Sequence, residues 1–243
     1  MTGRVLTMIG ATALALALSS WQASTASATP FDVLPPPAAR AFPGNQTAVA
    51  AQIGGGFHLL GHASGTTLHD ASSYEIWLLG NRSHGREILQ VVKGSLHRAA
   101  DQVRQISGVS LRVRVSMSGG TAPIGGVAPR PGQIVVSLGT ADMCSGKHRP
   151  AGCTTTLIES NAATGLATVV SARTVINNRE VRAYSRYHQD NVVAHELGHA
   201  LGLDEFNVLY GGRAQVMNAG NYSAGGIYRA GDRNGLVALR PVG

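Results

Sequence analysis

The stretch AHELGHALGLDE, residues 194–205, places two histidines four positions apart with a glutamate directly after the first. On an α-helix, residues four apart share a face, so His195 and His199 can bring two imidazole nitrogens to one metal ion. Glu196 flanks that face and can act as a general base toward a metal-activated water. The spacing therefore predicts a zinc site on a helix, and unrelated histidines on an ordinary helix are the alternative.

Two features farther along the chain narrow the interpretation. Gly202 stands three residues after His199, where a helix that stops and turns sharply needs a residue free to adopt positive φ. The segment AQVMNAG then supplies Met217. Together, HELGHALGLDE and Met217 resemble the signature of the metzincin zinc peptidases, His-Glu-x-x-His-x-x-Gly-x-x-(His or Asp) followed by a Met-turn. The segment AGDRNGLVAL, residues 230–239, is similar to the last core helix of these domains.

This resemblance implies a secreted bacterial endopeptidase of snapalysin-like or matrixin-like type. Its implied fold is α+β and metzincin-like: a twisted mixed β-sheet with a long N-terminal helix, an active-site helix carrying HExxH, a Met-turn and a C-terminal helix. The family's roles would make His195 and His199 ligands of Zn²⁺, Glu196 the general base and Met217 the hydrophobic floor. An ordinary core methionine is the alternative for Met217.

The third ligand departs from the family pattern. In the family's register that position is Glu205, whereas snapalysin-like peptidases resemble this chain in using an acid there but use aspartate. After His199 the only carboxylates are Asp204, Glu205 and Asp232. The register favours Glu205, with Asp204 as the alternative, and Asp232 is interpreted as the N-cap of the final helix. A lost zinc site is a further possibility.

Hydrophobic periodicity predicts one long amphipathic helix and several strands. Apolar residues keep a helical period over residues 86–106. Four other segments are short apolar or alternating runs typical of strands. This order suggests a mixed sheet with helices on one face. The four predicted strands are residues 74–79, 111–116, 132–139 and 166–173.

The N-terminus predicts export. A short basic start precedes an apolar run over residues 5–18, and Ala26-Ser27-Ala28 fits a cleavage site, so residues 1–28 are interpreted as a signal peptide. The apolar run is shorter than the about 20 residues of a membrane span. Residues 29–71, rich in proline, glycine and alanine, are interpreted as a linker or propeptide, and residues 72–243 as the catalytic domain.

Several residues in these regions carry weaker signals. His58 and His62 repeat the spacing of the later pair, but Leu59 replaces the acid, so the segment is interpreted as a histidine-containing loop. Asp32 or Asp70 could latch the zinc from the proposed propeptide. His188 could lie near the cleft, although a surface position is the simpler interpretation. Tyr222 lies too far beyond Met217 to be given the role of the tyrosine that some metzincins carry in the Met-turn.

The two cysteines, Cys144 and Cys153, predict a local disulfide because an oxidising compartment favours pairing. A metal knuckle that includes His148 is the alternative. The formal net charge of +7 suits association with anionic wall polymers, but no basic cluster with interleaved aromatics suggests nucleic-acid binding.

We therefore expect a monomeric secreted or wall-associated peptidase that acts on protein or peptide and is not inserted in the membrane after signal cleavage. Two other hypotheses stay open. One is an exported wall-binding module with a structural or lost zinc site, and the other is an amidase acting on wall peptide crosslinks.

Overall fold

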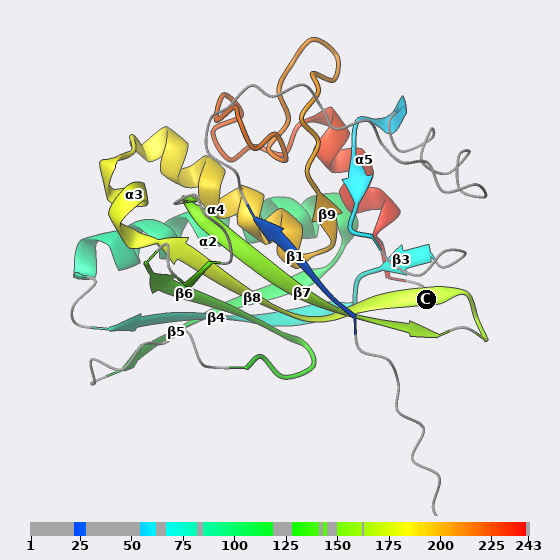
Figure 1. Ribbon diagram of the computed structural model, residues 1–243, viewed down its shortest axis with the longest axis horizontal. Helices are drawn as coiled ribbons and strands as arrows, with labels where there is room; N and C mark the ends of the chain where they lie inside the picture. The colour runs from blue at the N-terminus through cyan, green and yellow to red at the C-terminus, as the bar shows by residue number, and fades with distance from the viewer. Residues whose placement is uncertain are drawn as a thin grey trace, which may run out of the picture.

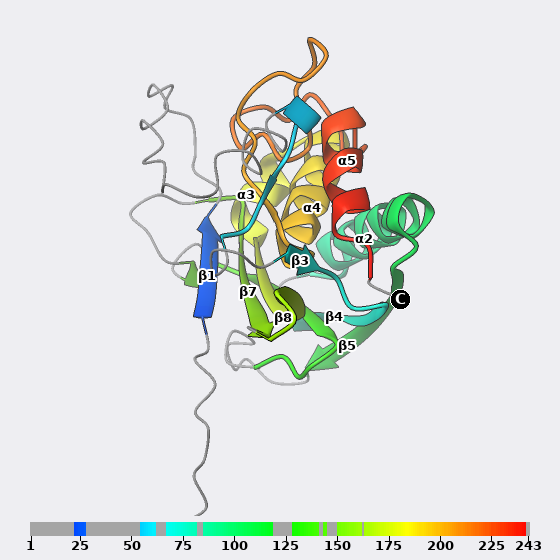
Figure 2. The ribbon, with the colours of Figure 1, turned by 90° about the vertical axis from the view of Figure 1, so that its right-hand side faces the viewer.

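The computed structural model describes residues 54–61, 67–81, 85–118, 128–140, 143–144, 150–161 and 163–241, and the backbone of residues 22–27. One sheet lies beneath a layer of helices (Figures 1 and 2). In chain order the elements are β1 (Gln22–Ser27), β2 (His58–Leu59), β3 (Thr67–His69), β4 (Ser73–Asn81), α2 (Arg86–Ser107), β5 (Ser110–Ser118), β6 (Gln133–Gly139), β7 (Gly152–Asn161), β8 (Leu166–Asn177), α3 (Asn178–Ala183), α4 (Arg186–Ala200), β9 (Leu203–Asp204) and α5 (Ala230–Ala238).

The sheet is mixed and mostly parallel. Its strand order is β1-β7-β8-β6-β4-β5, and β3 pairs additionally with β8. Strands β5, β4, β6 and β8 run parallel to one another, whereas β7 runs antiparallel to β8. The predicted mixed sheet with helices on one face is therefore confirmed, and α2 matches the predicted helix. The four predicted strands correspond to β4, β5, β6 and β8.

The core lies between the sheet and the helices. Along α2 the buried positions recur at helical spacing, as at Val92, Leu96 and Val103, which are all at most 1% exposed. The central strand β6 is buried from Ile134 to its end because it has a partner on each side and helices above it. α4 is buried along almost its whole C-terminal half, since it lies on β7 and β8 and packs beside α2.

Strand β7 was not predicted, because its sequence GCTTTLIESN begins with small and polar residues instead of an apolar run. Those residues face the helix that carries the histidines. The Thr156 hydroxyl donates a hydrogen bond to the His199 carbonyl at 2.8 Å, and Thr154 lies beside Glu196. The two threonine hydroxyls thus donate hydrogen bonds to polar groups of α4 on the buried face of the sheet.

Part of the range interpreted as linker or propeptide forms strands. β3 pairs in parallel with β8, and β2 pairs antiparallel with β9, the strand that follows α4. Of the predicted signal peptide, residues 22–27 form β1, which lies along β7, and the rest is outside the described residues. Signal cleavage and the role of 29–71 stay predictions. None of the helices within the described ranges has the length and apolar character to cross a membrane.

Candidate metal centre

Helix α4 places the two histidines in the interior. The helix begins after Ser185, whose hydroxyl accepts a hydrogen bond from the His188 backbone at 3.4 Å and so caps one of the free amides of the first turn. Its C-terminal half is almost wholly buried, and His195 and His199 are 4% and 0% exposed. An imidazole buried this deeply needs a partner for each nitrogen.

The outer nitrogen of each imidazole is held by a backbone carbonyl. His195 Nδ1 donates to the Val216 carbonyl and His199 Nδ1 donates to the Leu203 carbonyl, both at 2.9 Å. A carbonyl oxygen only accepts, so Nδ1 of each ring carries a proton, and Nε2 presents a lone pair whenever the ring is neutral. These two Nε2 atoms face each other 3.0 Å apart. Two lone pairs this close repel unless a cation or a proton lies beside them.

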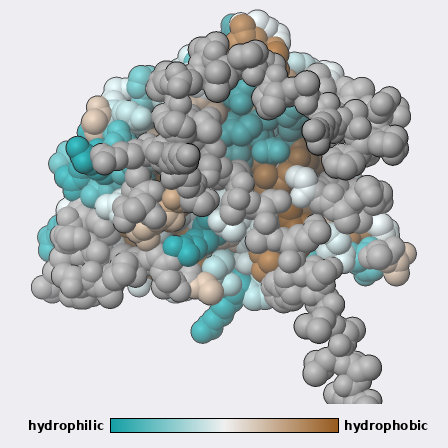
Figure 3. Space-filling model, in the orientation of Figure 1, coloured by the Kyte–Doolittle hydropathy of each residue, from teal (hydrophilic) through white to brown (hydrophobic). Residues whose placement is uncertain are grey.

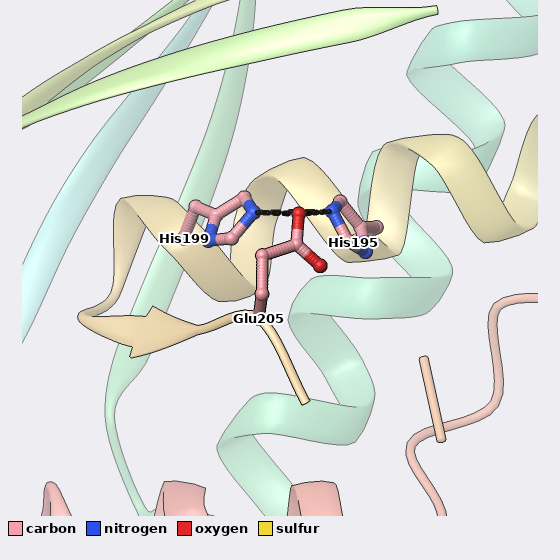
Figure 4. A group of neighbouring side chains, drawn as sticks. All are labelled: His195, His199 and Glu205. Carbon is pink, nitrogen blue, oxygen red and sulfur yellow. Dashed lines mark hydrogen bonds and ion pairs between the residues drawn. The ribbon is translucent and has the colours of Figure 1, made fainter. Parts of the chain in front are cut away.

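Glu205 brings a carboxylate to the same point. Its Oε1 lies 3.4 Å from His195 Nε2 and 3.5 Å from His199 Nε2, and the three side chains point toward one another (Figure 4). The side chain is 22% exposed, but both of its oxygens are hidden from solvent and neither accepts a hydrogen bond from the described residues. A buried carboxylate that accepts no hydrogen bond is chemically suited to binding a cation.

The charges in this group are strongly coupled. Burial lowers the pKa of His195, but the nearby Glu205 carboxylate more than offsets this and raises that pKa to about 9. Burial likewise raises the pKa of Glu205, but the charge of His195 and the contacts to both imidazoles bring it down to about 2. The charges of His195 and Glu205 therefore offset each other, and a divalent cation can take the place of the His195 proton.

The geometry fits a zinc ion. The three candidate ligand atoms lie within 4.8 Å of one another. Two nitrogens about 2.0–2.1 Å from a tetrahedral zinc lie about 3.3 Å apart, close to the 3.0 Å between the imidazoles. Each outer nitrogen is already oriented by a carbonyl, as ligand histidines require. Within the described residues the group has these three members only, so these residues leave one corner of a tetrahedron without a ligand.

The other carboxylates of the segment have structural roles. Asp204 Oδ1 accepts a hydrogen bond from the Glu205 backbone at 2.8 Å and is not in the group. The interpretation of Asp232 as an N-cap is wrong, because α5 begins one turn earlier with Arg229 as its N-cap. Asp232 instead accepts hydrogen bonds from the backbone of Val216, Met217 and Arg229 at 2.8, 3.2 and 2.9 Å. It thereby holds the turn whose carbonyl orients His195.

Glu196 lies against β7. Its Oε2 accepts a hydrogen bond from the Thr154 hydroxyl at 2.7 Å. The hydroxyl oxygens of Thr154 and Thr174 are in turn 2.9 Å apart. A methyl group at Gly152 would lie 2.7 Å from Glu196 Oε1, so the carboxylate occupies space that a side chain would take. Burial raises the pKa of Glu196, although the two histidines and Thr154 oppose this. Its Oε1 has no hydrogen-bond partner among the described residues and is free to accept a proton.

A small cavity adjoins Glu196. Its volume of about 10 Å³ is close to the space that one water molecule needs. Tyr222, which the sequence left without a role, lines it, and its ring packs against Tyr184 and His188. His188 thus stands in an aromatic wall beside the site, outside the metal group. The cavity is lined by Ala151, Val192, His195, Glu196, Ala219 and Tyr222.

Met217 packs against α4 at Gly198. It is 2% exposed, and its sulfur occupies the place where Gly198 would carry a side chain. A glycine at this point of α4 lets the thioether approach the helix between the two histidines. The role of Met217 as a hydrophobic floor under zinc stays a prediction.

The predicted disulfide between Cys144 and Cys153 is present. Cys153 lies between Gly152 and Thr154, so the crosslink fixes the part of β7 that contacts Glu196. His62, His148 and Asp32 lie outside the described residues. Asp70 is buried against Tyr74, whose hydroxyl lies 3.1 Å from Asp70 Oδ1, and it is not part of the metal group.

Comparison with known proteins identifies no family. No family model matches the chain, and no curated protein matches it. Eight solved chains match, and one of them is described as the GM1-bound form of the ECX AB5 holotoxin. That match has 14% identity and a TM-score of 0.31, and it covers 71% of this chain and 73% of the other. A likeness this weak carries no argument about this protein.

Proposed function

We propose that this chain is a secreted zinc-dependent endopeptidase of metzincin type. The observation that carries the proposal is the convergence of His195, His199 and the hidden carboxylate of Glu205, with Glu196 on the same turn of α4. A structural zinc site is closed by four protein ligands, whereas a catalytic site keeps one position open. The three-membered group supports the catalytic alternative over a wall-binding module with structural zinc.

The residues of the site have distinct roles in this proposal. His195, His199 and Glu205 would hold the zinc, which when bound polarises a water and a substrate carbonyl. Glu196 accepts the proton of the attacking water on Oε1 and then gives it to the leaving amine. Thr154 donates a hydrogen bond to Oε2, which leaves Oε1 without a hydrogen-bond partner among the described residues.

The electrostatics of Glu196 suit a general base. Burial raises its pKa, which brings its proton affinity closer to that of the group it must serve near neutral pH. The nearby imidazoles and Thr154 lower the pKa and keep the carboxylate able to ionise. Burial and Tyr184 raise the pKa of Tyr222, so its hydroxyl stays protonated beside the same cavity.

The proposal is tested by hydrolysis of an unfolded protein by the purified chain. We expect hydrolysis to stop when a chelator removes zinc and to return when zinc is added. Glu196→Gln keeps the shape of the side chain but removes the base, and we expect kcat/KM to fall about 10²–10⁴-fold. Glu159→Gln, at an exposed carboxylate on the same strand that contacts Glu196, is the control and should leave kcat/KM unchanged.

Two outcomes would count against the proposal. Hydrolysis that survives chelation would remove the role of the metal, and hydrolysis that survives Glu196→Gln would remove the role of the base. A purified chain that binds zinc but hydrolyses neither protein nor wall peptide would favour the binding module. Cleavage of wall peptide crosslinks alone would favour the amidase, which uses the same chemistry.

A further inference from the structure

A short segment far upstream in the sequence holds the turn that leads to Glu205. Strand β2 pairs antiparallel with β9, with His58 opposite Asp204 and Leu59 opposite Leu203. The backbone amide of Leu60 donates to the Gly202 carbonyl at 2.8 Å. Residues 54–61 therefore close over the whole turn between α4 and Glu205, the blue-green strand beside β9 in Figure 1.

His58 reaches one residue farther, to the candidate ligand itself. Its Nδ1 donates a hydrogen bond to the backbone carbonyl of Glu205 at 2.9 Å, although the two residues are 147 positions apart. Its ring meets the edge of Phe206 with 5.3 Å between ring centroids. The first contact is to the main chain of Glu205, and the second is to the side chain of the residue that follows it.

The position of the Glu205 carboxylate is set mainly by the position of the Glu205 backbone. Neither of its oxygens accepts a hydrogen bond from the described residues, so only the longer contacts of 3.4 and 3.5 Å to the two imidazoles reach the carboxylate. A glutamate has one more rotatable bond than an aspartate, and its carboxylate is correspondingly harder to position. The backbone is fixed instead: Asp204 caps the amide of Glu205, Met217 accepts from the amide of Phe206, and His58 holds the carbonyl.

We propose that His58 is a positioning residue for the metal ligand Glu205, and that residues 54–61 are part of the metal site. The inference rests on the proposed function in that it requires a divalent cation between the imidazoles and Glu205. Partners behind metal ligands typically change metal affinity by 10–100-fold when they are removed. A bond to the ligand's main chain falls at the lower end, so we expect about tenfold.

The other end of the segment is anchored on α5. The Asn234 side chain donates to the Gly55 carbonyl at 2.7 Å, and the Gly56 carbonyl fills the place where a side chain at Gly231 would lie. The segment is thus held at both ends by the folded domain. Processing that removed this segment would therefore take His58 away from Glu205.

The test compares three variants of the full chain by zinc affinity, measured in competition with a chromogenic chelator. His58→Leu removes the donor, and we expect zinc to bind about tenfold more weakly. His58→Asn places an amide N–H near the position of Nδ1, and we expect most of the affinity to return. His69→Leu is the matched control, because His69 Nδ1 also donates to a distant carbonyl, that of Arg240 at 3.1 Å, away from the metal group.

A second arm asks whether His58 acts through Glu205. Glu205→Gln should itself weaken zinc binding, and His58→Leu added to it should cause no further loss, because no carboxylate remains to be aimed. The absorption bands of bound Co²⁺ should change in His58→Leu and not in His69→Leu. A purely structural role would lower the melting temperature in both backgrounds and leave these bands unchanged.

The outcomes separate the two proposals. If the unaltered chain binds no zinc, the proposed function falls and this inference falls with it. If the unaltered chain binds zinc and folded His58→Leu binds it equally well, only this inference is overturned. The inference is also overturned if His58→Asn is as weak as His58→Leu, or if His58→Leu weakens the Glu205→Gln chain by a further tenfold.

Discussion

Gly152→Ala isolates the position of Glu196 from every other feature of the site. The backbone φ of Gly152 is not positive, so alanine fits there without backbone strain. Its new methyl group would lie 2.7 Å from both Cγ and Oε1 of Glu196, where ordinary contacts begin at 3.4 Å. The carboxylate must therefore move by about 0.7 Å, and a displacement of about 1 Å from productive geometry can cost about 10²-fold in rate.

We expect Gly152→Ala to lower kcat by up to about 10²-fold and to reduce the unfolding free energy by about 1–3 kcal/mol, as overpacking does. Zinc affinity should be unchanged, because the three atoms nearest the new methyl all belong to Glu196. The assays are steady-state hydrolysis, thermal denaturation and chelator competition. Gly94→Ala on α2, where a methyl meets only the flexible ends of Arg186 and Arg98, is the control. Full activity of Gly152→Ala would refute the placement of the base against β7.

Four further predictions address the framework of the site. Gly202→Ala should destabilise the chain by about 1–3 kcal/mol in denaturant titration, because φ there is +102°, and an unchanged midpoint would contradict this. Asp232→Asn should destabilise by about 3 kcal/mol, since an amide cannot accept the three backbone hydrogen bonds with both of its ends; equal stability in the same titration would argue against that role. Replacing both Cys144 and Cys153 by serine should cost about 2–3 kcal/mol by the same measurement, and no loss would show that the crosslink constrains little. Burial raises the pKa of Asp70, so its neutral form favours the folded state and stability falls as pH rises through that pKa; Asp70→Asn should gain stability over the unaltered chain at pH 8 and not at pH 4, and a difference that does not change with pH would contradict this.

The helical half of the site could be predicted from the sequence because its information is local. A spacing of four residues fixes which side chains share a face of α4, and a glycine fixes where the helix can turn. The choice between Glu205 and Asp204 also followed from register, and the structure brings Glu205 to the histidines. The metzincin assignment itself, the zinc and the secretion stay predictions.

The parts that the sequence missed depend on contacts between distant segments. Strand β7 has polar residues where a strand pattern expects apolar ones, because Thr154 and Thr156 serve hydrogen-bonding groups of α4. The sequence shows His58 and His62 four positions apart, but it does not show that His58 contacts the backbone of Glu205. Tyr222 lies five residues past Met217, and only the folding of the loop between them brings it to the cavity. Hydrophobic periodicity carries no information about these contacts between distant residues.

The exposure of the surface near the site could not be predicted from the sequence either. The loop that follows β9 carries Val208 and Leu209, each 58% exposed, and a hydrophobic patch lies over this loop at the top of Figure 3. The sequence shows two apolar residues there without showing whether they are buried. Their exposure depends on how the loop leaves Glu205 and returns to Met217.

The central claim is tested most directly by a crystal structure of the zinc-loaded chain with an anomalous difference map recorded at the zinc edge. The account predicts one strong peak bonded to Nε2 of His195, Nε2 of His199 and one oxygen of Glu205, with a solvent oxygen at the fourth corner within hydrogen-bond reach of Glu196. A peak closed by a fourth protein side chain, or no peak between the two imidazoles, would contradict it.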